Sequence, residues 1–286
     1  MMMSLTRMMY FALLACIVAQ QLLSGAMASD GSGALSIIVK MDQAPQPEGK
    51  SQLEKDAIEM NTTTNLTNVL DSRKSNFTIS VTGDIAYKLH PLYVTMLGTK
   101  NNHELIMGGM TSGEGLVSFE DQDARMRKNK KYVEDDYVCG GKQFQVAGYL
   151  PQPDSYNMSS YKIMDDLELL YLVDDKGLPE SQGKSMPYPM EGFGFYVVSV
   201  SESQGIRLSD AAAKAAGLNG TQWYDALAGK LDEAKGTGEP MVVVFTNVVS
   251  GSGEYLDAYK KFIEYAAGKD ASFITTRDLV NSYKSV

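Results

Sequence analysis

The sequence has few residues for covalent or metal-based cross-linking. Its 286 residues include 2 cysteines, 2 histidines and 1 tryptophan. Cys16 lies in an apolar amino-terminal segment, so a processed chain would keep only Cys139, which cannot form an internal disulfide. We therefore expect stability from packing, with Cys139 either a buried free thiol or a bridge to another molecule.

The sequence also lacks a hydrophobic run that could span a membrane. The run Met8–Val18 has about 11 residues, whereas a spanning helix needs about 20. Arg7 before this run and Ala26-Met27-Ala28 after it are typical of a cleaved secretory signal peptide. We predict a signal peptide over 1–28, a mature domain over 29–286, and a secreted protein without a membrane anchor. An uncleaved anchor is the alternative.

An excess of positive charge is missing as well. The chain has 26 Lys and Arg against 35 Asp and Glu, a net charge of -9, which disfavours nucleic acid and anionic membranes as partners. It contains no G-x-S-x-G elbow, phosphate loop, dinucleotide fingerprint or D-x-D-x-D-G calcium loop. These absences argue against serine hydrolases, nucleotide-binding enzymes and EF-hand proteins, and we expect no cofactor.

Sequons for N-glycosylation, in contrast, are more frequent than the number of asparagines would give by chance. The candidate glycosylation sites are Asn61, Asn65, Asn76, Asn157 and Asn219. Together with the predicted signal peptide, they indicate a protein located outside the cell.

Short apolar segments alternate with helical segments along the chain. The expected strands are Leu35–Val39, Phe77–Val81, Glu104–Met107, Phe144–Tyr149, Leu169–Val173, Phe193–Val200, Met241–Phe245 and Ser272–Ile274. The expected helices include a polar one with Leu53, Ile58, Leu66 and Leu70 facing inward, one around Leu92–Leu97, and others over Ser118–Tyr132, Ser160–Leu167, Ser209–Ala216, Thr221–Lys235 and Tyr255–Ala267, with a last one from Thr276. This alternation predicts one α/β domain in which parallel strands form a closed or nearly closed barrel.

Several segments resemble polysaccharide deacetylases of the NodB-homology type. "FTISVTGDIAYKLHP" followed by "GTKNNHELIMGGMTS" resembles the run that precedes the family's metal histidines. "AGYLPQPDSYN", "LELLYLVDD", "MVVVFTNVVSG" and "FITTRDLVNSY" resemble its later segments. The resemblance implies an irregular (β/α) barrel with its site at the carboxyl ends of the strands.

The resemblance also implies a metal-dependent hydrolysis, because a divalent ion polarises the amide carbonyl and activates water. Asp42 stands where the family has its catalytic base. Gln43 replaces the carboxylate ligand, and Gly108 and Ser112 replace the two histidine ligands. Because none of the three residues is a strong metal ligand, we predict no bound metal, a vestigial base at Asp42, and no enzymatic activity.

The remaining family positions are also replaced. The arginine position falls on Leu150 and the final histidine near Thr246. Of the two histidines, His103 occupies a structural position of the family, and His90 precedes a proline in a connection.

Two acidic pairs remain, and each has two interpretations. Asp165-Asp166 and Asp174-Asp175 are carboxylate pairs of the kind that glycosidases use. Adjacent aspartates usually point apart, however, so loop or helix-cap roles are favoured.

We predict an inactive deacetylase-like protein that serves as a structural, self-associating component of an extracellular envelope, cell wall or sheath. A weaker, compositional resemblance links the chain to sheath and surface-layer proteins of filamentous methanogenic archaea. One alternative is a glycan-binding protein in which Tyr149, Tyr156 and Tyr161 contact a cell-surface glycan. A deacetylase with a rearranged site is the other.

Overall fold

A computed structural model of the protein describes residues 33–42, 49, 51–83, 85, 103–111, 113–136, 138–139, 142–143 and 145–284. The predicted signal peptide, the helix expected around Leu92–Leu97, His90, Gln43 and Ser112 lie outside these residues, as does the side chain of Cys139. Within the described ranges, no helix combines the length and the apolar character needed to pass through a bilayer.

The expected strands and helices that lie within the described residues occur in the predicted order, together with short strands that the sequence did not predict. The strands are β1 (Ala34–Met41), β2 (Phe77–Val81), β3 (His103–Met107), β4 (Val138–Cys139), β5 (Lys142–Gln143), β6 (Gly148–Tyr149), β7 (Tyr171–Asp174), β8 (Tyr188–Pro189), β9 (Tyr196–Ser199), β10 (Glu202–Ser203), β11 (Ile206–Arg207), β12 (Met241–Thr246) and β13 (Ser272–Ile274). The helices are α2 (Gln52–Ser72), α4 (Phe119–Asp136), α5 (Met158–Asp166), α6 (Asp210–Ala215), α7 (Gly220–Thr237), α8 (Asn247–Ser250), α9 (Gly253–Gly268) and α10 (Thr276–Lys284), with short 3-10 turns η1 (Glu114–Leu116) and η2 (Pro179–Ser181).

The main sheet curls into an irregular barrel. Its strand order is β12-β1-β2-β3-β6-β7-β9-β8, and β13 pairs with the start of β1. All neighbours are parallel except β8, which is antiparallel to β9. The two edges of the sheet come together where the segment after β9 bonds to β12. Ser201 N–H donates to Val242 O at 2.9 Å, and Val244 N–H donates to Leu208 O at 3.0 Å. The prediction of a single α/β domain with a barrel of parallel strands is confirmed.

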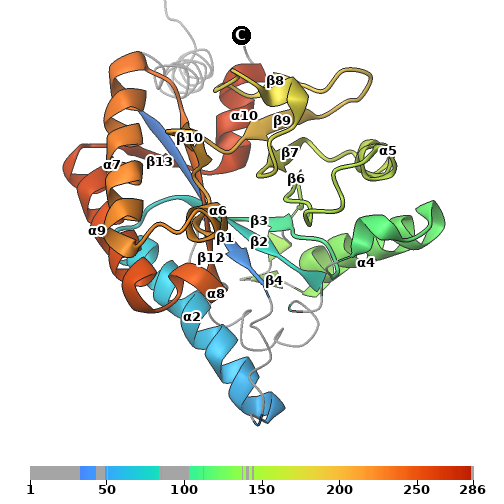
Figure 1. Cartoon of the computed structure of the whole chain (residues 1–286). Helices are drawn as coiled ribbons and strands as arrows, with labels where there is room; N and C mark the ends of the chain where they lie inside the picture. Colours follow the sequence, from blue (N-terminus) through green and yellow to red (C-terminus); the bar gives the residue numbers. More distant parts are fainter. Residues whose placement is uncertain are drawn as a thin grey trace, which may run out of the picture. The chain divides into compact units, whose positions relative to one another are not determined.

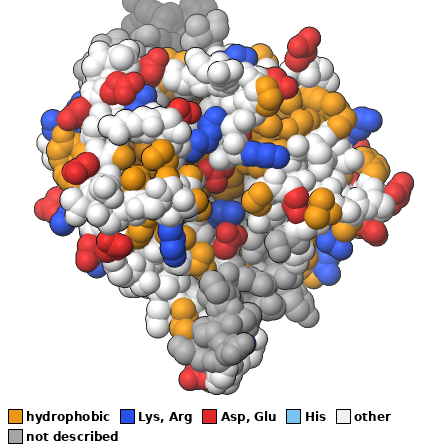
Figure 2. Space-filling model, in the orientation of Figure 1, with side chains coloured by type: hydrophobic (Ala, Val, Ile, Leu, Met, Phe, Trp, Pro, Cys, Tyr) orange, Lys and Arg blue, Asp and Glu red, His pale blue; other side chains and the backbone are white. Residues whose placement is uncertain are grey.

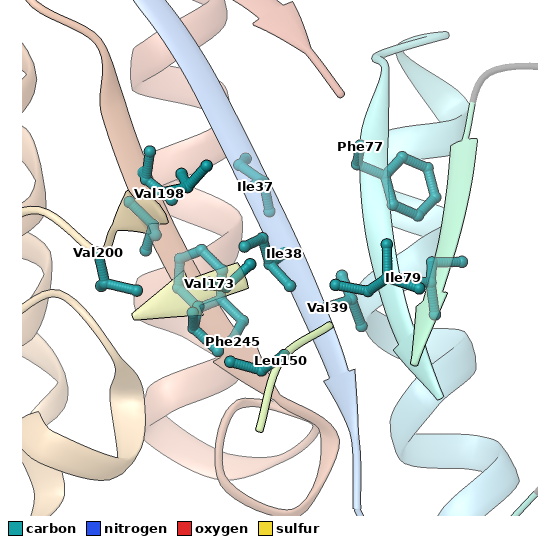
Figure 3. Close-up of a cluster of buried hydrophobic side chains, with 14 of the residues drawn as sticks. Ile37, Ile38, Val39, Phe77, Ile79, Leu150, Val173, Val198, Val200 and Phe245 are labelled. Atoms are coloured by element: carbon teal, nitrogen blue, oxygen red, sulfur yellow. The ribbon is translucent and has the colours of Figure 1, made fainter. Parts of the chain in front are cut away.

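Helices cover the outside of the barrel. Figure 1 shows α2, α7, α8 and α9 on one side of the sheet and α4 and α5 on the other. The ring of Phe245 lies 4.7 Å from that of Tyr259 and 6.2 Å from that of Trp223, which places it between β12 and the helices α9 and α7. The strand residues in Figure 3 have at most 1% of their surface exposed. Burial on both faces explains why these strands read as continuous apolar runs.

Hydroxyl and carboxylate groups close the amino end of the barrel. Ser36 and Thr78 both lie within 3.0 Å of the hydroxyl of Thr276 at the start of α10. Arg277 N–H donates to the buried carboxylate of Glu104 at 2.9 Å. Because these side chains come from β1, β2 and β3 and meet at one helix, they face the barrel interior. Residues two and four positions later on the same strands therefore face inward as well, toward the carboxyl end.

The boundaries of some elements differ from the prediction. The charged helix expected over 118–132 is present as α4 and is four residues longer at its carboxyl end. The strand expected over 144–149 is reduced to β6, because Val146 N–H donates to the side chain of Glu134 at 3.0 Å and not to a neighbouring strand.

The inward face of α2 is only partly as predicted. Leu66 and Leu70 are fully buried, whereas Leu53 is 80% exposed. Figure 1 shows the reason: the amino-terminal part of α2 extends past the end of the sheet, so none of the described strands lies beneath it.

Candidate functional site

An ion pair lies at the carboxyl end of β1, at the mouth of the barrel. Lys40 shares the strand face of Ser36 and therefore points inward, and its Nζ lies 3.1 Å from Oδ2 of Asp42. The Lys40 side chain is 11% exposed, so the ammonium is largely removed from water. Asp42 N–H donates to the amide oxygen of Asn247 at 2.9 Å, which ties the end of β1 to the end of β12. The carboxylate at the predicted base position is thus already paired with a cation.

The first predicted histidine position is closed by packing. Gly108 follows β3, and a Cβ atom placed on it would lie 2.9 Å from Ser80 Oγ and 3.1 Å from Thr82 N. Two hydrogen bonds fix this backbone: Gly108 N–H donates to Val81 O at 2.9 Å, and Gln152 Nε2 donates to Gly108 O at 2.6 Å. A side chain at this position would require the neighbouring strand to move. The second predicted histidine position, Ser112, lies outside the described residues.

The positions that correspond to the family's arginine and last histidine hold no ionisable group. Leu150 is fully buried and belongs to the apolar cluster of Figure 3. Thr246 ends β12, and its N–H donates to Oδ2 of Asp210 at 2.7 Å. Burial raises the pKa of Asp210 to about 6, although hydrogen bonds from Ser250 and Thr246 act in the opposite direction.

The acidic pair that follows β7 is divided between two roles. Asp174 is fully buried and accepts hydrogen bonds from Gly177 N–H at 2.7 Å, Leu178 N–H at 2.8 Å and the Ser181 hydroxyl at 2.6 Å. It therefore holds the loop after β7, which agrees with the loop interpretation. Asp175 lies at the mouth. Burial raises its pKa, opposed first by the charge of Lys40 and then by a hydrogen bond from Ser209.

The other acidic pair and the described histidine also contact structural partners. Asp165 accepts a hydrogen bond from Gly194 N–H at 2.7 Å, so its carboxylate anchors a loop. His103 starts β3, and its ring centroid lies 5.6 Å from that of Phe77.

A buried carboxyl group near the mouth was not anticipated from the sequence. Glu114 has no exposed surface, although it lies in a glycine-rich loop. Its carboxyl group accepts hydrogen bonds from Met110 N–H at 3.2 Å and from the Tyr149 hydroxyl at 3.3 Å. Burial raises the pKa of Glu114 to about 7, against these two hydrogen bonds. Gly109, with φ of 81°, allows the close approach, since a Cβ there would lie 2.4 Å from Oε2 of Glu114. Glu114 therefore fixes the loop that follows β3.

The structure does not support sugar stacking on two of the three predicted tyrosines. Tyr149 is fully buried and Tyr161 is 7% exposed, packed 5.9 Å from the ring of Phe193. Tyr156 is half-buried, and its hydroxyl donates to Val173 O at 3.0 Å. The Tyr149 hydroxyl donates to Glu114, and the Tyr161 ring, on α5, packs against Phe193, so neither ring is free to stack on a sugar.

The five predicted glycosylation sites differ in their surroundings. Asn61, Asn65 and Asn219 are exposed, and Asn76 is half-buried. The amide nitrogen of Asn65 donates to a backbone carbonyl at 3.0 Å. That of Asn157 donates to two carbonyls, at 3.3 and 3.4 Å, while its oxygen caps α5. Asn219 caps α7 through its oxygen, which accepts from Gln222 N–H at 3.0 Å, so Asn61 is the site at which a glycan would disturb the fold least.

The predicted metal ligands lie only partly within the described residues. Among them, no group of three His, Cys, Asp or Glu side chains is close enough to share an ion. Gln43 and Ser112 lie outside the described ranges, so the complete predicted ligand set is not visible. At the described positions, Gly108 has no side-chain donor atom and its carbonyl accepts from Gln152, while Asp42 is paired with Lys40.

Neither a family model nor a curated protein matches the sequence. Solved structures, however, share the fold. A protein from Mycobacterium smegmatis assigned to the polysaccharide deacetylases is 16% identical, with a TM-score of 0.68 over 90% of this chain and 92% of its own. Puue allantoinase is 13% identical, with a TM-score of 0.70 over 88% of this chain and 90% of its own.

A CE4 family pseudoenzyme from Bacillus anthracis is also similar in structure. It is 10% identical, with a TM-score of 0.57 over 88% of this chain and 66% of its own. A mutant of that pseudoenzyme is described as having restored enzymatic activity. At these identities the likeness establishes the deacetylase-type fold and leaves the activity open, because one fold hosts many functions. These matches give no support to the resemblance to archaeal sheath proteins.

Proposed function

We propose that this chain is an exported, catalytically inactive protein on the deacetylase fold, and that it serves as a structural component of the extracellular envelope. The observation that carries the inactivity is the ion pair between Lys40 and Asp42 at the barrel mouth. It places a lysine side chain beside the only predicted catalytic residue that the chain retains.

The charge of Lys40 opposes a metal ion at this place. A divalent cation bound to Asp42 would lie close to the ammonium, and at 4 Å with an effective dielectric constant of 20 their repulsion is about 8 kcal/mol. The metal would therefore have to displace Lys40, whose side chain is largely buried. In place of a metal ion, the ammonium of Lys40 balances the charge of the Asp42 carboxylate.

Two further features support inactivity. Gly108 is packed so closely that an imidazole would not fit without movement of β2. Leu150 presents a hydrocarbon surface where the resembled family has an arginine that steadies the base. The first position therefore lacks a metal ligand, and the second lacks the cation that would support the base.

The envelope role is supported by the sequence and by the exposure of two sequons. The predicted signal peptide would export the chain, and Asn61 and Asn219 are accessible to glycosylation. The net charge of -9 suits a hydrated outer surface.

An acetate-release assay tests the inactivity. Purified mature protein is incubated with N-acetylglucosamine oligosaccharides and with zinc, cobalt, nickel or manganese ions in turn, and with a chelator as reference. We expect no acetate above buffer in any condition, and the same result for Asp42→Ala. Acetate release that disappears with the chelator and with Asp42→Ala would show that the chain is an active deacetylase.

Fractionation of the native cells tests the envelope role. We expect the chain in the residue that remains after detergent extraction, released only by denaturants. Recovery of the chain as a freely soluble monomer in the medium would contradict a structural role and leave the inactivity untouched.

A further inference from the structure

A groove of about 580 Å³ lies between the helices α7 and α9 on the outside of the barrel. Its lining includes four carboxylates and one ammonium group, from Asp225 on α7 and from Glu254, Asp257, Lys261 and Glu264 on α9. The ion pairs that these two helices form among the described residues use other side chains, those of Lys230 with Glu233 and of Lys269 with Asp232. The groove therefore carries a negative charge that the chain itself does not balance.

Two tyrosine rings form the apolar part of the same groove. Tyr224 and Tyr265 are half-buried, and their ring centroids lie 6.2 Å apart at an angle of 82°. The hydroxyl of Tyr265 donates to Asp232 at 2.7 Å, which fixes this ring, and the ammonium of Lys269 lies 5.1 Å from its centroid. Aromatic faces attract cations and also pack against the hydrocarbon stems of lysines. The groove thus suits a partner surface that presents lysines.

A surface with the matching charge is the outer face of α4. Ala124, Lys128 and Lys131 are exposed, and their spacing of four and three positions places them in one row along the helix. The two ion pairs within α4 use neither of these lysines. The ammonium of Lys128 lies 5.4 Å from the ring centroid of Tyr132, its neighbour on the same helix. A row at this spacing is the arrangement by which a helix docks into a groove.

The groove and the α4 row lie on opposite sides of the barrel. Figure 1 shows α7 and α9 along the left side and α4 at the right. In the same orientation, Figure 2 shows mostly carboxylates along the left edge, and lysine and arginine side chains at the lower right. The two surfaces therefore cannot meet within one molecule, although they can meet between two. A contact between different surfaces of identical subunits repeats from one copy to the next.

We propose that the groove between α7 and α9 binds the outer face of α4 of a second copy of this chain, so that copies associate head to tail. Lys128 and Lys131 of one copy meet the carboxylates of the next, and the small side chain of Ala124 permits close approach. A single exposed ion pair contributes little affinity, but several like charges on each side determine which surfaces meet. The proposal rests on the structural role proposed above, for which it supplies the contact between subunits.

Sedimentation velocity over a concentration series of the mature chain, produced without glycosylation, tests the contact. We expect species larger than the monomer at about 20 mM sodium chloride, and an association constant at least roughly tenfold lower at about 500 mM, because salt screens exposed charges. A monomer throughout the series at low salt would overturn the self-contact. Association that does not respond to salt would overturn its electrostatic origin.

Two charge-reversed variants test which surfaces pair. Lys128→Glu with Lys131→Glu, and Asp225→Lys with Asp257→Lys, should each be monomeric at low salt with the melting temperature of the wild type, because all four residues are exposed. An equimolar mixture of the two variants should associate again, because the unchanged groove of the first complements the unchanged α4 of the second, and the two reversed surfaces complement each other. A variant that had merely lost its fold would not be rescued by mixing.

The matched control is Arg73→Glu with Lys214→Glu, the same change of charge at exposed positions on other surfaces, which should associate like the wild type. Association that persists in either reversed variant would refute the surface that it alters. Two variants that remain monomeric when mixed would show that the surfaces do not bind each other. Either result is distinguishable from failure of the envelope role, because a chain that stays in the detergent-insoluble residue is still a structural component, with a different subunit contact.

Discussion

Glu114 provides the sharpest test of the energetics around the barrel mouth. It is a fully buried carboxyl group with two hydrogen-bond donors and no cation within hydrogen-bonding distance among the described residues. Burial raises its pKa from 4.5 to about 7. The substitution Glu114→Gln keeps the shape and the acceptor oxygen for Met110 N–H but removes the ionisation. It therefore isolates the cost of a buried charge.

The sign and size of the effect follow from the raised pKa. Because the folded chain holds this proton more tightly than the unfolded chain, its contribution to stability is fully present below pH 4.5 and is lost as the pH rises through 7. A shift from 4.5 to about 7 corresponds to about 3 kcal/mol in the free energy of unfolding at 1.36 kcal/mol per pH unit. We expect Glu114→Gln to be about as stable as the wild type at pH 4.5 and up to about 3 kcal/mol more stable at pH 8.

Urea unfolding between pH 4.5 and 8.5 measures this difference. Burial also raises the pKa values of Asp210, Glu104 and Asp175, so the wild-type profile contains several contributions of the same sign. Subtracting the stability of Glu114→Gln from that of the wild type at each pH cancels the contributions of these three groups. Glu264→Gln, at an exposed position on α9, is the matched control and should follow the wild type. Parallel profiles for wild type and Glu114→Gln would refute the argument that burial controls this carboxyl group.

Three further predictions concern packing and modification. Gly108→Ala should lower the free energy of unfolding by about 1–3 kcal/mol through overpacking. Gly229→Ala, in open space on α7, is the control and should be neutral or stabilising. Equal effects of the two substitutions in urea unfolding would contradict the close packing around Gly108. Leu150→Ala should cost about 2–5 kcal/mol in the same assay, and a loss below 1 kcal/mol would show that the barrel interior is loosely packed. Glycopeptide mass spectrometry should find Asn61 modified more often than Asn157, whose amide is bonded in the fold; the reverse order would contradict this assignment.

The sequence predicted the barrel because its strands leave a local signal. Segments such as 35–39 and 241–245 are β-branched and free of charge, which is the composition required when a parallel strand is buried on both faces. The prediction failed where a contact with another element decided the outcome. The strand expected over 144–149 is interrupted because Val146 bonds to Glu134 of α4, and Leu53 is exposed because α2 extends past the sheet.

The candidate site was only partly visible in the sequence. Asp42 and Gly108 were found by their positions in segments that resemble a known family. Lys40 was missed, although a signal was present: a lysine at the end of a buried apolar strand, two residues from an aspartate, is expected to need an internal partner.

The sequence by itself determined the order of the main strands and helices and the parallel barrel, because each of these depends on residue type and local periodicity. The tertiary structure alone decided which carboxyl groups are buried, that an ammonium neutralises Asp42, and that a tyrosine such as Tyr149 lies beneath the surface. Burial and electrostatic pairing are set by neighbours that are remote in the chain, so they appear only when the sheet has curled and brought those neighbours together.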